Sequence, residues 1–215
     1  MPRCELDHIV IAANSLDDGA TYLEETLGVS IPAGGEHPLM GTHNCLMQIG
    51  GGAFLELIAI NPNAPEPKRP RWYNLDETHL QARMAERPVL LTWVVRTDDI
   101  TRAATTSLIS PGPIEEGRRG NRVWSITIPQ DGTMPEDGLF PTLIEWHDFD
   151  GPTSDMADPG CRLEGLKIYH PEPERLSEAL GVIGAGVLAQ VEQASEHVHG
   201  LRALFQTPRG PVEIS

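Results

Sequence analysis

Residues 6–29, LDHIVIAANSLDDGATYLEETLGV, and residues 41–60, GTHNCLMQIGGGAFLELIAI, decide the fold of this chain. The first stretch predicts a strand, a helix capped by Ser15 and a turn at Gly28. The second predicts two strands joined by a tight turn at three successive glycines. We assign these elements to one module, residues 1–60.

Two polar side chains stand inside these apolar strands. His8 lies in the opening strand and Glu56 in the closing one. Side chains alternate along a strand, so His8 shares a face with Val10, and Ile9 with Ile11. Burying a histidine or a carboxylate is costly unless it is hydrogen-bonded or bound to something. His8 and Glu56 are therefore the first candidates for a functional site.

The same order of elements returns downstream. Residues 88–148 contain PVLLTWVVRTDDITRAATTSL, a strand and a helix, and NRVWSITI and FPTLIEWHD, two further strands, which predict a second module of the same kind. Aligning the strand-helix junctions, with Asp98 or Thr97 as the helix cap, matches His8 to Thr92. Aligning AFLELI with TLIEWH matches Glu56 to Glu145. Such repetition points to duplicated supersecondary units.

Residues 162–215 form a third, weaker βαβββ-like unit. Here Gly165 stands in the position of His8, and Glu213 in that of Glu56. We expect this unit to be structural or to complete an oligomer such as a homodimer. The Pro-rich segment 61–87 links the first two units, and an acidic, turn-rich segment at 148–161 precedes the third.

These repeats resemble the vicinal oxygen chelate superfamily, and within it the glyoxalase-like domain proteins. The segments most similar to that group are GTHNCLMQIGGGAFLELI and RPRWYNLD. The resemblance implies an α+β fold whose repeated βαβββ modules form a curled mixed sheet, a cup around a divalent metal ion. It also implies ligands from the first and last strands of each module, here His8, Glu56, Thr92 and Glu145. Threonine is a poor ligand for such ions.

Another histidine would have to fill the place of Thr92. His43 begins the strand expected to pair with that of Glu56, and we favour it over His147, which we expect nearer the rim. A site with two histidines and one carboxylate would make a ring-cleaving or other non-haem iron dioxygenase an alternative. His37, in the preceding glycine-rich loop, is expected to be hydrogen-bonded or exposed.

The metal hypothesis leads to a specific reaction. His8, Glu56, Glu145 and His43 would hold Zn, Ni, Mn, Mg or Fe, and the ion would polarise a substrate with two neighbouring oxygens. Glu145 or Glu56 would then move a proton as general base. This predicts a metal-dependent lyase or isomerase. One alternative is a metal-free binding protein for drug-like molecules, and another is a chain that kept the fold and acts only through interactions.

Substrate contacts are expected from four residues, namely Arg71, Trp72, Thr92 and His147. Arg71 and Trp72 end the Pro-rich segment, which either drapes over the cup or packs Trp72 on the surface. A binding protein could use Trp72, Trp93, Trp124 and Trp146 as aromatic walls. However, Trp93 and Trp146 are expected on the faces opposite Thr92 and Glu145, packed against helices.

Composition narrows the class of protein. The chain has 215 residues, 40% of them hydrophobic, which is enough for a substantial core. A net charge of −15 disfavours nucleic acid as a partner. We expect no membrane partner, because no apolar run is long enough to span a bilayer. Three cysteines without CxxC spacing fit a reducing cytoplasm.

Overall fold

The computed structural model describes residues 3–147 and 151–215. Residues 1–2 and 148–150 lie outside it, so the end of the second predicted unit and the start of the acidic segment stay undescribed. The elements are β1 (Cys4–Ala12), α1 (Leu16–Leu27), β2 (Ala33–His37), β3 (Thr42–Gln48), β4 (Phe54–Ile60), η1 (Trp72–Asn74), α2 (Thr78–Glu86), β5 (Val89–Thr97), α3 (Ile100–Thr106), β6 (Ile114–Arg119), β7 (Arg122–Thr127), η2 (Pro135–Gly138), β8 (Thr142–Trp146), η3 (Pro152–Asp155), β9 (Arg162–His170), α4 (Pro173–Val182), β10 (Gln190–Gln193), β11 (Gly200–Thr207) and β12 (Gly210–Ile214).

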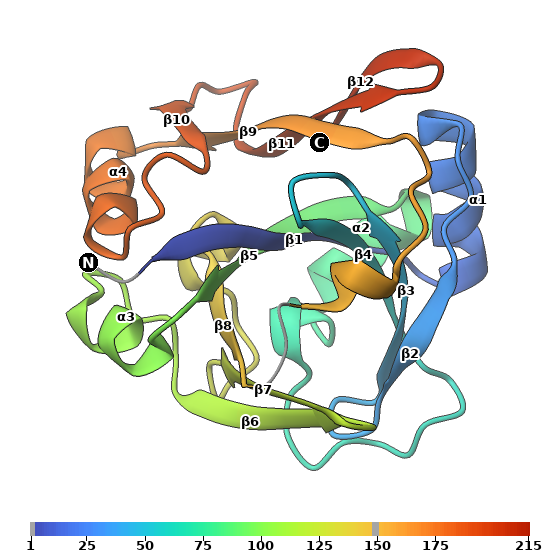
Figure 1. The fold of residues 1–215 in the computed structure, drawn as a ribbon, viewed down its shortest axis with the longest axis horizontal. Coiled ribbons are helices and arrows are strands. Elements are labelled where there is room, and N and C mark those ends of the chain that lie inside the picture. Colours follow the sequence, from blue (N-terminus) through green and yellow to red (C-terminus); the bar gives the residue numbers. More distant parts are fainter. Residues whose placement is uncertain (1–2, 148–150) are drawn as a thin grey trace.

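Strands β1 to β8 form one curled sheet, in the order β2-β3-β4-β1-β5-β8-β7-β6. In each half the first strand runs parallel to the last, β1 to β4 and β5 to β8, while β1 and β5 join the halves antiparallel. The sheet bends until its edges approach one another (Figure 1). A Cβ on Gly35 of β2 would lie 2.6 Å from an Arg119 guanidinium nitrogen of β6. The expected α+β fold with a cup-shaped mixed sheet is confirmed.

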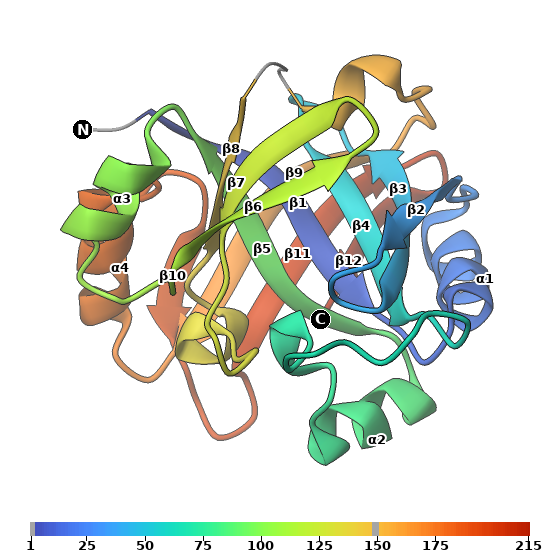
Figure 2. The same cartoon turned by 90° about the horizontal axis from the view of Figure 1, so that it is seen from below.

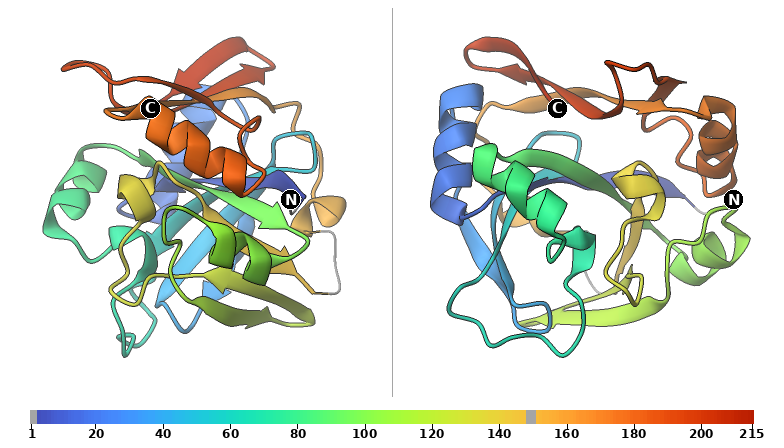
Figure 3. Two further views of the ribbon diagram at one scale, coloured as in Figure 1. Left: turned by 90° about the vertical axis from the view of Figure 1, so that its left-hand side faces the viewer. Right: turned by 180° about the vertical axis from the view of Figure 1, so that it is seen from behind.

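The last four strands form a separate sheet, β10-β9-β11-β12. Their order differs from that of the two halves of the cup, because β9 pairs in parallel with β10 and not with the last strand. Glu213 lies on the edge strand β12, paired with Arg202 at 2.7 Å, and is not part of the cup. Figure 3 shows this sheet stacked over the outer face of the cup, between α1 and α4.

Short-range signals explain the first unit. The Ser15 hydroxyl caps α1 by accepting the N–H of Asp18 at 3.1 Å, and Gly28 ends it in the left-handed conformation (φ 74°). Gly50, Gly51 and Gly52 all have positive φ in the β3–β4 turn. For α3 the cap is Asp99, not Asp98 or Thr97, and its carboxylate accepts the N–H of Arg102 at 2.9 Å.

Each face of the sheet has its own core. On the outer face, Ile9, Ile11, Leu55 and Leu57 pack with α1, α4 and the second sheet. On the inner face, Val10, Ala12 and Ile58 pack with residues of the linking segment. The alternation predicted for β1 and β4 is confirmed. His8 and Glu56, whose side chains line the cavity inside the cup, belong to the inner face.

The linking segment enters the cup. Trp72, Tyr73 and Leu75 are buried there, and Leu80 and Met84 of α2 pack beside them. Figure 2 shows α2 at one end of the strands. Of the two expectations for this segment, the structure favours the one in which it drapes over the cup.

Two further observations concern the chain as a whole. Its three cysteines are unpaired. No helix among the described residues is long and apolar enough to span a membrane.

Candidate functional site

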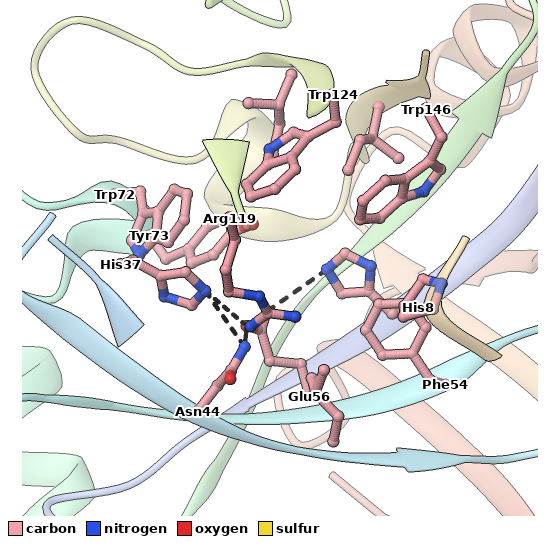
Figure 4. A pocket seen from close by; sticks show the side chains of 14 residues that line it. His8, His37, Asn44, Phe54, Glu56, Trp72, Tyr73, Arg119, Trp124 and Trp146 are labelled. Atoms are coloured by element: carbon pink, nitrogen blue, oxygen red, sulfur yellow. Dashed lines mark hydrogen bonds and ion pairs between the residues drawn. The ribbon is translucent and has the colours of Figure 1, made fainter. Parts of the chain in front are cut away.

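A cavity of about 470 Å³, including its open mouth, lies inside the cup. Both halves of the sheet and the linking segment contribute to it (Figure 4). Its lining residues are His8, His37, Asn44, Leu46, Phe54, Glu56, Trp72, Tyr73, Arg119, Trp124, Ile126, Ile144, Trp146 and Pro152. Aromatic walls around a few polar groups are typical of small-molecule sites.

Three buried ionisable groups meet on one side of this cavity. His8 Nδ1 lies 2.6 Å from Asp7 Oδ1, and His8 Nε2 lies 3.5 Å from Glu56 Oε2. Burial alone would lower the pKa of His8, but the hydrogen bonds and charges of Asp7 and Glu56 raise it from 6.5 to about 9. Burial would raise the pKa of Glu56, but the His8 imidazolium and the Asn44 amide lower it from 4.5 to about 2. At pH 7 the site therefore holds an imidazolium between two carboxylates.

A break in strand register brings Asp7 and His8 together. Neighbouring residues of a regular strand face opposite ways, but the β1–β5 pairing shifts between Leu6 and His8. Asp7 is buried and holds His8 with one oxygen. Its other oxygen accepts the indole N–H of Trp146 at 2.9 Å. Asp7 thereby fixes both the ring of His8 and one aromatic wall.

A second histidine lies across the cavity. The Asn44 amide donates to Glu56 Oε1 at 2.6 Å and lies 3.3 Å from His37 Nε2. His37 Nδ1 lies 3.0 Å from the Thr42 hydroxyl. Burial lowers the pKa of His37, the charge of Glu56 raises it and that of Arg119 lowers it, and the net effect is a pKa below the ordinary value. His37 is hydrogen-bonded as expected, and it also lines the cavity.

Arg119 brings a positive charge to the opposite wall. Its side chain extends from β6 toward Glu56 (Figure 4), and burial and the charge of Arg122 lower its pKa while Glu56 raises it. Arg122 is paired with Asp155 at 2.7 Å. Within residues 3–147 and 151–215, by contrast, Arg119 has no ion-pair partner.

The strand register corrects the sequence alignment of the second half. Val10 pairs with Glu56, and its counterpart Val94 pairs with Thr142. The residue that corresponds to Glu56 is therefore Thr142, three positions before Glu145. The same register supports Thr92 as the counterpart of His8, because His8 pairs with Val94 just as Thr92 pairs with Val10.

The hydroxyl groups of both threonines in the second half are hydrogen-bonded within the protein. The Thr92 hydroxyl donates to the Gly138 carbonyl at 2.9 Å. Thr142 is hydrogen-bonded to Tyr73 of the linking segment. Burial and the charges of Glu56 and Asp7 raise the pKa of Tyr73 well above its ordinary value. The second half therefore carries neutral hydroxyl groups where the first carries a charged pair.

Three other residues expected at the site, Glu145, His43 and His147, do not line the cavity. Glu145 accepts the N–H of Ile100 at 2.8 Å, at the start of α3 on the outer face, so it does not converge with His8 and Glu56. His43 alternates with Asn44 and also faces outward, beside Glu36. His147 is exposed and lies 2.8 Å from the Ser125 hydroxyl. Trp146 lines the cavity and does not pack on a helix, whereas Trp93 is in the outer core as expected.

The linking segment contributes Trp72 but not Arg71. Trp72 lines the cavity, with its ring centroid 5.0 Å from that of His37. Arg71 is buried beside the segment's own Asp76, at 2.6 Å, and does not line the cavity. Its role is to hold the segment in place.

The metal site expected by resemblance does not fit this donor set. His8 and Glu56 could supply two ligands, but their counterparts in the second half are Thr92 and Thr142, and threonine is a poor ligand for divalent metal ions. The other two proposed ligands, Glu145 and His43, face outward. In the described part of the chain, no three His, Cys, Asp or Glu residues form a group that could hold a metal ion.

Sequence reasoning missed Asp7, Asn44 and Arg119. Asp7 precedes His8 in the sequence, but the bulge that turns it inward leaves no local signature. Asn44 is the neighbour of His43 on β3 and faces the opposite way. Assigning the other face of this strand to the cup would therefore have identified Asn44. Arg119 comes from the far edge of the sheet and meets the site only when the cup closes.

Comparison with known proteins adds the family. A family model described as a glyoxalase-like domain matches residues 6–183. No curated protein matches the sequence significantly. A hypothetical protein from Staphylococcus aureus is similar in structure, with a TM-score of 0.58, 14% identity, and 98% of this chain and 84% of that chain covered.

Two further solved structures are more distant. A methylmalonyl-CoA epimerase from Mycobacterium tuberculosis has a TM-score of 0.39 at 18% identity, covering 71% of this chain and 91% of that one. A hypothetical protein from Bacillus halodurans C-125 has a TM-score of 0.43 at 16% identity, covering 68% of this chain and 95% of that one. At such identities the likeness concerns the fold alone.

Proposed function

The chain belongs to the glyoxalase-like domain family, and from this premise we propose that its cup binds a small organic molecule with two neighbouring oxygens, on which His8 and Glu56 move a proton. The reaction would be of isomerase or lyase type. The observation that carries the proposal is the buried Asp7–His8–Glu56 cluster, which opens onto an aromatic cavity.

A buried cluster of charged groups is an unfavourable way to stabilise a fold. Taking three charges out of water costs several kcal/mol per ion, and apolar residues of similar volume often stabilise a fold as well or better. Ionisable groups with strongly shifted pKa values in a cleft are therefore candidates for function. Here the pKa of Glu56 is about 2 and that of His8 about 9, and both groups line the same cavity.

The ion pair suits a concerted proton transfer. With a substrate carbonyl oxygen against His8 Nε2, a neighbouring C–H group would face Glu56. The C–H bond breaks, its proton forms an O–H bond on Glu56, and its electron pair forms the C=C bond of an enol. His8 gives its proton to the carbonyl oxygen at the same time. Returning a proton to carbon at another position completes an isomerisation, and expelling an adjacent leaving group completes an elimination.

The coupling between the two groups favours this path. Each group's pKa is shifted by the charge of the other, so neither should act alone at neutral pH. In the concerted step the imidazolium–carboxylate pair becomes a neutral pair, and no net charge is created in the buried site. Asp7 keeps Nδ1 protonated and so directs Nε2 at the substrate.

The alternative functions have less support. A metal-dependent lyase or isomerase, or an iron dioxygenase, requires ligands that the second half of the cup does not offer. A binding protein without chemistry would explain the aromatic walls, but not the buried charges beneath them.

The test is proton exchange on carbon. The protein, treated with EDTA, would be incubated in D₂O with 2-oxo acids such as phenylpyruvate, and deuterium entering C3 would be followed by NMR. We expect exchange above the buffer rate, lost in His8→Gln and Glu56→Gln. It should be retained in Glu145→Gln, the matched carboxylate on the outer face.

Other outcomes would count against the proposal. Ligand binding without exchange in the wild type would favour the binding protein. Exchange that appears only after Mn²⁺, Ni²⁺, Zn²⁺ or Fe²⁺ is added, with the ion bound stoichiometrically, would favour the metal-dependent enzyme.

A further inference from the structure

A second hollow continues the cavity outward. It has an empty volume of about 470 Å³ and shares His37, Trp72, Trp124 and Ile126 with the first. Its other apolar lining residues are Pro38, Leu39, Met40 and Ile128. The two hollows form one continuous site, here called the groove, which runs from His8 between Trp72 and Trp124 to Leu39.

The apolar end of the groove contains a side chain that the fold does not explain. Leu39 is 72% exposed, although large apolar side chains are stabilised by leaving water. Trp124 lies nearby, directly against Gly117, where a Cβ would lie only 2.2 Å from its indole ring. The absence of a side chain at Gly117 makes room for this aromatic wall of the groove. Both features suit an apolar group that lies along the groove.

Charge distinguishes the two ends of the groove. At the inner end the Arg119 guanidinium has no ion-pair partner among the described residues, whereas the Glu56 carboxylate there is already held by His8 and by the Asn44 amide. The outer hollow is lined by Glu36, by Glu115, which pairs with Arg69 at 2.5 Å, and by Glu116, which pairs with Arg118 at 3.6 Å. The inner end therefore offers an anionic group an unpaired cation, and the outer end does not.

Resting on the proposed function, we propose that the substrate is an amphipathic organic acid. Its carboxylate pairs with Arg119, and an oxygen on the adjacent carbon meets His8. Its aryl or alkyl body lies between Trp72 and Trp124 and reaches Leu39. Arg119 is then the residue that selects acids, and the outer hollow is the part that selects size.

Binding can be measured without any reaction. The probes are a homologous series of phenylalkanoates, from phenylacetate to 5-phenylpentanoate, and the corresponding primary amides, titrated by calorimetry. In the wild type each added methylene should strengthen binding about 3- to 4-fold. Each acid should bind on the order of tenfold more tightly than its amide, because a charge-assisted pair with Arg119 replaces a neutral contact.

Two variants separate the ends of the groove. Arg119→Gln should abolish the preference for acid over amide and keep the chain-length dependence, whereas Arg102→Gln, an exposed arginine on α3, should change neither. Leu39→Ser should weaken only the longest probes, by roughly 3- to 10-fold. Leu108→Ser, which removes another leucine that is 60% exposed, should leave all probes unchanged.

Three results would overturn the inference. They are equal affinity for acids and amides in the wild type, an equal effect of Leu39→Ser on short and long probes, and a change of oligomeric state in Leu39→Ser on analytical ultracentrifugation. The last would mean that a second copy of the chain covers the groove. Binding as predicted without any C3 exchange would instead refute the proposed reaction and leave this inference standing.

Discussion

Replacing Glu56 by glutamine should destabilise the protein in a pH-dependent way. Glutamine keeps the volume of the side chain and can still accept from Asn44, but it removes the charge that faces His8. Folding lowers the pKa of Glu56 from 4.5 to about 2. At 1.36 kcal/mol per pH unit, this corresponds to about 3 kcal/mol of stability.

The direction of the pH effect follows from the two shifts. The pKa of Glu56 is lower in the folded state, so its contribution is present above pH 4.5 and is lost as the pH falls toward 2. The pKa of His8 is higher in the folded state, so its contribution is present below pH 6.5 and is lost as the pH rises through 9. Both shifts report the same pair, and their energies are not added.

Urea unfolding at constant ionic strength measures this effect. We expect Glu56→Gln to lose about 2–3 kcal/mol relative to the wild type at pH 7, and about 1 kcal/mol near pH 3. A double-mutant cycle with His8→Gln should give a coupling energy of about 2–3 kcal/mol at pH 7. Glu145→Gln, the same substitution on the outer face, serves as the control. A loss for Glu56→Gln that is the same at pH 7 and pH 3 would refute the assignment of an ion pair.

Two further predictions concern the walls of the site. Asp7→Asn should slow C3 proton exchange by roughly 10- to 100-fold and move the alkaline limb of its pH profile downward, because His8 loses the carboxylate that raises its pKa; a pH profile identical to the wild type would argue against this positioning role. Gly117→Ala should push Trp124 into the groove and weaken binding of 5-phenylpentanoate at least tenfold with little loss of thermal stability, and an unchanged affinity in calorimetry would argue against this packing of the indole wall.

The sequence predicted the first half of the site because the evidence there is local. His8 and Glu56 interrupt apolar strands whose alternation is regular, so their common face follows from the strand period alone. The structure places both in the inner cavity, 3.5 Å apart. The cap at Ser15 and the turn at Gly28 are equally local, and both are confirmed.

The sequence alignment of the second half was wrong by three residues. Matching AFLELI to TLIEWH placed a glutamate over a glutamate, but an odd shift turns every side chain of a strand to the other face. The register of β8 on β5 instead matches FLELI to FPTLI. This alignment keeps the phenylalanine, leucine and isoleucine positions and leaves Thr142 opposite Glu56. Similarity of the apolar positions was therefore a better guide than the shared carboxylate.

Restoring the missing ligands tests this register directly. If Thr92 and Thr142 are the counterparts of His8 and Glu56, Thr92→His with Thr142→Glu should place two histidines and two carboxylates around one point, as the family resemblance implies. Tyr73 is hydrogen-bonded to Thr142, so Tyr73→Ala is added to make room.

The triple variant should bind one Zn²⁺ or Ni²⁺ per chain, measured by metal analysis after dialysis, and Tyr73→Ala alone should bind none. Thr92→His with Tyr73→Ala is the decisive comparison. With His8 and Glu56 it offers three ligands, and Glu145 could supply a fourth only if it faced the cup, whereas the structure ties Glu145 to the start of α3. We therefore expect this double variant to bind the ion more weakly than the triple variant does. Equal affinity in the two variants, with the fold intact by circular dichroism, would show that the three-residue correction is wrong.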